Sequence, residues 1–136
     1  MTSKVTYLGG LRTECIHIKS GQTIITDAPT DNSGKGEAFS PTDLTATSLG
    51  TCMITIMGIA ANNHNINIDG ATLEITKIMA SDPRRISAVE VKLIMPDALY
   101  TLKEQKILET AARTCPVALS LHPDLHQVLE FVWKKA

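Results

Sequence analysis

The chain has 136 residues, of which 43% are hydrophobic and 20% are charged, with Lys+Arg 13 and Asp+Glu 14. This balance is typical of one ordinary globular domain, so we expect a single domain over residues 1–136. The formal charge of −1 gives no excess of cations to neutralise phosphates, which excludes nucleic acid as an expected partner.

The first quarter of the chain alternates apolar and polar residues, which is typical of β-strands. The pattern predicts three strands, near residues 4–8, 11–18 and 22–27. Gly9-Gly10 and Ser20-Gly21 are turn signals between them, so we expect an antiparallel meander. Residues 27–37 are rich in Gly, Asp, Asn, Ser and Pro, which predicts a surface loop.

A long helix should begin after this loop. Ser40 is a helix N-cap, Pro41 suits the first helical position, and Asp43 completes a capping box. The helix is expected to run from Pro41 to about Asn63 and is apolar on nearly every side. Because threonine and serine interrupt its apolar segment, we interpret it as a core helix rather than a membrane span, and expect no membrane partner.

The second half of the chain predicts two longer strands, near 70–80 and 86–95, joined by the turn at residues 81–85. A capping box at Thr101–Glu104 then begins a second helix. Its predicted inward positions are Leu102, Leu108, Ala111, Ala112 and Cys115. Pro116 should end that helix, and a helical turn near 117–121 and a strand near 127–133 complete an α+β fold with two helices central to the core.

Three cysteines, at positions 15, 52 and 115, are the residues with most chemical potential. An odd number without a CxxC pair is not a disulfide framework, and residues 1–7 lack a secretory signal pattern, so we expect a cytoplasmic protein. Only about 3% of an unperturbed thiol is ionised at pH 7. Cys52 in a packed helix is therefore either a core residue or a reactive thiol, whereas Cys15 is expected to be structural.

Cys115 is open to the same two interpretations. It precedes Pro116 at a helix end, where unpaired N–H groups of the next turn favour an anion. From the residues alone, neither thiol has an assigned role.

Two segments resemble the OsmC/Ohr family. Residues 36–53, from Gly36 to Met53, look like the family's helix segment with its reactive cysteine, and Cys115-Pro116-Val117 resembles its second cysteine motif, 63 residues after Cys52. The stretches 7–14 and 21–29 are similar to the N-terminal strands of the OsmC-like branch.

The resemblance implies an OsmC-like two-layer fold, with antiparallel sheets around a long central helix, assembled as an intertwined homodimer. It also implies a thiol-dependent peroxidase that reduces organic peroxides, and hydrogen peroxide as a further substrate. Cys52 would attack the peroxide and Cys115 would resolve the product to a disulfide. An external dithiol of the lipoyl or thioredoxin type would reduce it, with no cofactor and no metal.

Such chemistry needs a cation beside the thiolate and a carboxylate that orients the cation. The candidate cation is Arg12. The alternative interpretation is that Arg12 is a solvent-exposed charge on a strand, without a role in catalysis. Family members carry glutamate directly after the helix-opening proline, where this chain has Thr42. Asp43 and Glu37 are the candidate replacements, and Asp43 is equally explained by capping. Thr42 favours the alternative of a redox sensor or small-ligand-binding dimer without efficient turnover, and an inert structural dimer is a third possibility.

Overall fold

The computed structural model describes residues 1–135. The chain forms two compact units, Met1–Thr45 and Ala46–Ala136, which are described one after the other. The expectation of one domain over residues 1–136 stays a prediction.

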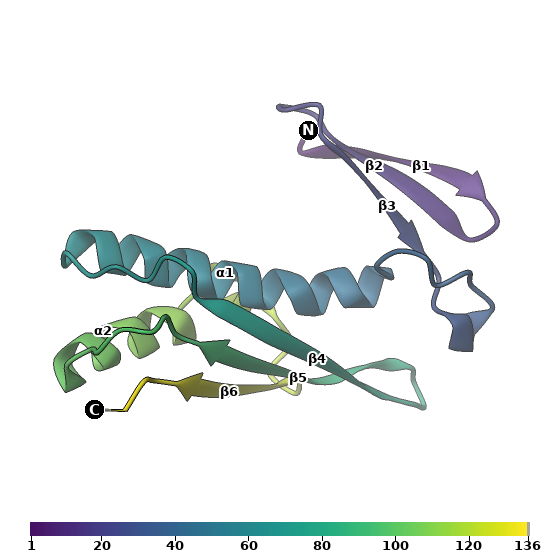
Figure 1. Cartoon of the computed structure of the whole chain (residues 1–136). Helices are drawn as coiled ribbons and strands as arrows, with labels where there is room; N and C mark the ends of the chain where they lie inside the picture. Colours follow the sequence, from purple (N-terminus) through teal and green to yellow (C-terminus); the bar gives the residue numbers. More distant parts are fainter. Residues whose placement is uncertain (136) are drawn as a thin grey trace. The chain divides into compact units, whose positions relative to one another are not determined.

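The first unit is the predicted antiparallel meander, with strands in the order β1-β2-β3 (Figure 1). The strands are β1 (Ser3–Gly9), β2 (Arg12–His17) and β3 (Thr23–Asp27). The loop that follows contains a short 3-10 helix, η1 (Thr30–Asn32). The turn between β1 and β2 places Gly9, Gly10 and Leu11 at positive φ, a region that glycine adopts without strain.

Residues 1–45 bury polar side chains and no apolar ones. Thr26, Asp27 and Ser40 are the buried residues in this part of the chain. One row across the three strands pairs Val5 with Cys15 and Cys15 with Ile24, and both Val5 and Ile24 are exposed. A three-stranded sheet needs an apolar face packed against another layer to be stable.

Helix α1 (Pro41–Asn63) has the bounds that the sequence predicted. The hydroxyl of Ser40 accepts a hydrogen bond from the Asp43 N–H at 3.1 Å, and the Asp43 carboxylate accepts one from the Ser40 N–H at 3.0 Å. This is the expected capping box. By length and composition α1 could cross a membrane, a test that the core helix of a soluble protein also passes.

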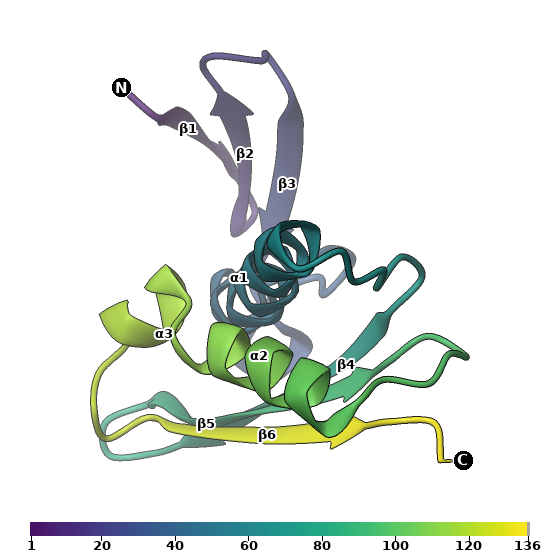
Figure 2. The ribbon, with the colours of Figure 1, turned by 90° about the vertical axis from the view of Figure 1, so that its left-hand side faces the viewer.

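The second unit contains the sheet β4-β5-β6, with strands β4 (Thr72–Ala80), β5 (Arg85–Ile94) and β6 (His126–Val132). β4 and β5 pair antiparallel, whereas β5 and β6 pair parallel. A parallel pair requires a crossover, which helices α2 (Leu102–Arg113) and α3 (Pro116–Ser120) supply. Figure 2 shows α1 and α2 on the same face of this sheet.

The hydrophobic core lies between these helices and the sheet. Val89, Val91 and Leu93 are buried along β5, and Met95, directly after its end, is buried as well. α1 contributes Leu49, Met53 and Met57, and α2 contributes Leu108 and Ala112, all fully buried.

The predicted inward position of Leu102 is wrong, because its side chain is 83% exposed. At 100° per residue, Leu102 lies roughly 120° around the helix axis from Leu108. It therefore lies off the buried stripe of Leu108 and Ala112. Cys115 is buried as predicted, although it is the N-cap of α3 rather than a residue of α2.

Candidate functional site

The thiols of Cys52 and Cys115 are neighbours in the second unit. α1 presents Cys52 half-buried, packed against the core cluster to which Cys115 belongs. Cys115 itself is fully buried. All three cysteines are free thiols. Because Cys52 is the more accessible of the two, it is the thiol that a small reactant from solvent can reach first.

Cys115 is held in its place by the start of α3. Its sulfur accepts a hydrogen bond from the backbone N–H of Ala118 at 3.3 Å. Burial raises the pKa of the Cys115 thiol above its ordinary range, and the neighbouring Cys52 thiol raises it further. The N–H groups of Ala118 and Val117 act in the opposite direction without reversing the shift. Cys115 is therefore a protonated thiol at neutral pH, and it must give up its proton before it can attack an oxidised neighbour.

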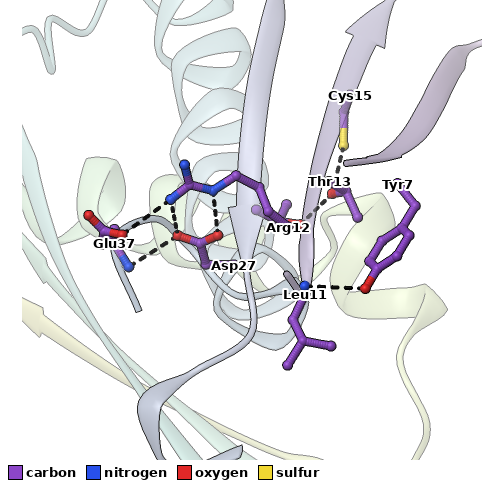
Figure 3. A network of polar contacts seen from close by, with 8 residues as sticks. Tyr7, Leu11, Arg12, Thr13, Cys15, Asp27 and Glu37 are labelled. Carbon is purple, nitrogen blue, oxygen red and sulfur yellow. Dashed lines mark hydrogen bonds and ion pairs between the residues drawn. The ribbon is translucent and has the colours of Figure 1, made fainter. Parts of the chain in front are cut away.

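The first unit contains a second cluster, centred on Arg12 and Asp27 (Figure 3). Arg12 Nε donates to Asp27 Oδ1 at 2.7 Å, and Nη2 donates to Oδ2 at 2.8 Å. Nη2 also reaches Glu37 Oε1, at 3.5 Å. We call these three residues the arginine clamp.

The clamp is held in place by its backbone and its charges. β2 and β3 place Arg12 and Asp27 directly opposite each other in register. The N–H of Glu37 donates to Asp27 Oδ2 at 3.2 Å, which ties the loop to the clamp. Hydrogen bonding from Arg12 lowers the pKa of Asp27 despite its burial, and the charges of Arg12 and Lys35 act in the same direction. Asp27 is thus an ionised carboxylate at neutral pH.

Of the three residues in the clamp, the sequence singled out Arg12 and Glu37 but not Asp27. A two-residue turn at Ser20-Gly21 would have placed Arg12 opposite Pro29. The loop is instead closed by a hydrogen bond from the backbone N–H of His17 to the carbonyl oxygen of Gln22, at 2.8 Å. This shifts the pairing of β2 with β3 by two residues, so Arg12 lies opposite Asp27. An acidic residue near the end of the third strand was the only signal available.

The remaining candidates lie around the start of α1. Asp43 takes part in the capping box described above, the alternative that the sequence left open. Thr42 stands at the position where the family glutamate is expected. Its hydroxyl lies 3.2 Å from the hydroxyl of Ser40, so it makes a local contact at the start of α1. Cys15 on β2 lies 3.9 Å from the Thr13 hydroxyl. Within residues 1–135, no group of three or more His, Cys, Asp or Glu side chains could hold a metal ion.

The fold and the site define a class of protein: a two-layer α+β protein in which a half-buried thiol, Cys52, lies beside a buried one, Cys115. The family model described as OsmC-like protein matches residues 34–128, which include both Cys52 and Cys115. The chain belongs to the OsmC family. No curated protein matches it.

Solved structures agree with the family. A candidate osmotic stress induced and detoxification response protein of Psychrobacter arcticus is 56% identical, with a TM-score of 0.93 over 96% of this chain and 95% of that one. The organic hydroperoxide resistance protein OsmC of Legionella pneumophila is 16% identical, with a TM-score of 0.76 over 97% of each chain. The organic hydroperoxide resistance protein OhrB of Bacillus subtilis is 21% identical, with a TM-score of 0.71 over 96% and 98%. The last two identities support the shared fold alone.

Proposed function

We propose that this protein is a thiol-dependent peroxidase that reduces organic hydroperoxides, with hydrogen peroxide as a further substrate. The observation that carries the proposal is the pairing of a half-buried Cys52 with a buried, protonated Cys115. The names of the Legionella and Bacillus proteins support the same class of substrate.

The thiol pair can complete the chemistry in two steps. The Cys52 thiolate attacks the outer oxygen of the hydroperoxide, the O–O bond breaks, and the alkoxide takes a proton to leave as an alcohol. Cys52 becomes a sulfenic acid. The Cys115 thiol gives its proton to the departing hydroxide and attacks the sulfur of Cys52, so that water leaves and the two residues form a disulfide. Peroxide has been reduced by two electrons, and the two thiols have lost them.

We assign to Arg12 the cation that such a reaction requires. A guanidinium stabilises a thiolate and donates hydrogen bonds to the oxygen that gains charge as the O–O bond breaks. Arg12 keeps its charge at every relevant pH, because the Asp27 carboxylate raises its pKa further. Glu37 and Asp43 remain further candidates for contact with this site.

We also propose that the active protein is a homodimer. No apolar side chain of residues 1–45 is buried in one copy of the chain, and two large ones, Val5 and Tyr7, are 59% and 64% exposed. On α1, Ile59 is 54% exposed and Thr51 and Thr55 are exposed beside it. A second copy of the chain would cover these surfaces and give the meander the second layer it needs.

Catalytic turnover requires an external reductant. A dithiol of the lipoyl or thioredoxin type would reduce the Cys52–Cys115 disulfide by exchange through a mixed disulfide. This cycle needs a reducing compartment, and we expect the protein in the cytoplasm.

The test is peroxide consumption under turnover conditions, with cumene hydroperoxide as substrate and dihydrolipoamide or reduced thioredoxin as electron donor. We expect turnover in the wild type, its loss in Cys52→Ser, and activity close to wild type in Cys15→Ser. Equal activity in wild type and Cys52→Ser would overturn the proposal.

A second candidate function is a redox sensor or small-ligand-binding dimer that forms the disulfide without efficient turnover. The contact of Thr42 with Ser40 favours it, because a hydroxyl stands where family members carry glutamate. The turnover assay separates the two, since a sensor would be oxidised once by peroxide and would not consume it steadily with either dithiol.

A further inference from the structure

The carboxylate that orients Arg12 in this chain lies on the sheet, at Asp27. We infer that Asp27 is the positioning residue for Arg12, in place of an acidic residue at the start of α1. The inference rests on the proposed peroxidase function, because that function assigns to Arg12 the stabilisation of the thiolate and of the peroxide oxygen.

The contacts separate Asp27 from the other candidates. Asp27 binds two nitrogens of Arg12 at 2.7 and 2.8 Å, a bidentate geometry that fixes both the position and the plane of the guanidinium. Glu37 makes a single contact at 3.5 Å from a side chain that is 67% exposed. Asp43 accepts a hydrogen bond from Ser40 in the capping box. Only Asp27 has the geometry of a rigid anchor.

The burial of Asp27 is unusual for a purely structural ion pair. The Asp27 side chain is fully buried, whereas no apolar side chain of residues 1–45 is. Removing a carboxylate from water is costly, and a buried ion pair is weak evidence for stability. Stability alone therefore does not account for this pair, and burial holds the Asp27 carboxylate fixed beside Arg12.

The clamp leaves one edge of Arg12 available. Nε and Nη2 are engaged by Asp27 and Glu37, whereas Nη1 has no hydrogen-bond partner within residues 1–135. In Figure 3 that nitrogen points away from both carboxylates. The Arg12 side chain is 26% exposed, so a reactant can approach it. Two N–H groups on a fixed, charged nitrogen suit a peroxide oxygen or a thiolate sulfur.

The test is a double-mutant cycle on the rate of single-turnover thiol oxidation by cumene hydroperoxide, with reduced protein at several pH values. Asp27→Asn should slow the reaction by about 10- to 100-fold, because a displaced guanidinium loses its alignment. The rise of the rate with pH should also move to higher pH. Arg12→Ala should be at least as slow, and the double variant no slower than Arg12→Ala alone, since Asp27 acts through Arg12.

Asp69→Asn, which removes an exposed carboxylate in the second unit, is the matched control and should react like the wild type. If Asp27→Asn does not fold, Asp27→Glu replaces it in the same cycle, because it keeps the charge and moves the carboxylate by one methylene group. A wild type that does not react would overturn the proposed function and the role of Asp27 with it. A reactive wild type with an equally reactive Asp27 variant, or additive losses in the double variant, would overturn the role of Asp27 alone.

Discussion

The sulfur of Cys115 accepts a hydrogen bond from the backbone N–H of Ala118 at 3.3 Å, so the proposed resolving thiol is also the N-cap of α3. Removing the cap acceptor should cost stability separately from any effect on redox chemistry. We expect Cys115→Ala to lower the free energy of unfolding by about 1 kcal/mol relative to Cys115→Ser, whose hydroxyl can accept the same bond. Urea unfolding of the two variants under reducing conditions measures this difference, and equal stabilities would contradict a capping contribution from the side chain at position 115.

The raised pKa of Cys115 predicts a stability that falls in alkaline solution. The folded protein keeps this thiol protonated at a pH where the unfolded chain releases the proton. The unfolded state then binds fewer protons, so the free energy of unfolding decreases as pH rises through the ordinary thiol range, above about pH 8.5. Urea unfolding at pH 7 and pH 9.5 should show a decrease in wild type that is smaller in Cys115→Ser. A decrease of equal size in both proteins would contradict the assignment.

Gly50 allows α1 to approach β4 closely. A Cβ at this position would lie 2.4 Å from Cδ1 of Ile75, whereas a Cβ at Gly58 would meet nothing within 4 Å. We expect Gly50→Ala to lower the free energy of unfolding by about 1–3 kcal/mol through overpacking. Gly58→Ala, the matched control, should gain up to about 1 kcal/mol from helix propensity. Denaturant unfolding of both variants tests the contrast, and a more stable Gly50→Ala would contradict the close packing.

Gly34 is predicted to be essential to the loop that supports the arginine clamp. A Cβ there would lie 1.7 Å from the carbonyl oxygen of Ala28, the residue directly after Asp27. Because the obstacle is backbone, Gly34→Ala should displace the loop, and both thermal stability and the single-turnover rate with cumene hydroperoxide should fall. Gly9→Ala is the control, since its Cβ would meet nothing within 4 Å and it adds only the strain of a positive φ, about 1–2 kcal/mol. A Gly34→Ala protein that matches wild type in both measurements would show that the loop can adapt.

The α-helices and the strands could be predicted from sequence because their signals are local. Ser40 and Pro41 define the start of α1, and alternation along β5 defines the face that Val89, Val91 and Leu93 bury. The placement of Leu102 was wrong because a leucine directly after an N-cap lies off the stripe defined by Leu108 and Ala112. Local patterns identify elements, but they fix the rotation of a helix end less well.

The candidate site divides in the same way. Cys52 and Cys115 are found by motif, whereas their neighbourhood follows from the packing of α1 beside α3 and had no signal in the residues. Asp27 was missed because its pairing with Arg12 depends on the length of the loop between β2 and β3. The parallel pairing of β6 with β5 likewise depends on a crossover through two helices, a non-local contact that periodicity does not specify.

The most direct test of the proposed mechanism is to treat the reduced protein with one equivalent of cumene hydroperoxide per chain, count the remaining free thiols, and map any disulfide by mass spectrometry. We predict the loss of two thiols per chain and a Cys52–Cys115 disulfide, with Cys15 still reduced. Both thiols remaining free, or a disulfide that involves Cys15 instead, would contradict the assignment of Cys52 and Cys115 as the reacting pair.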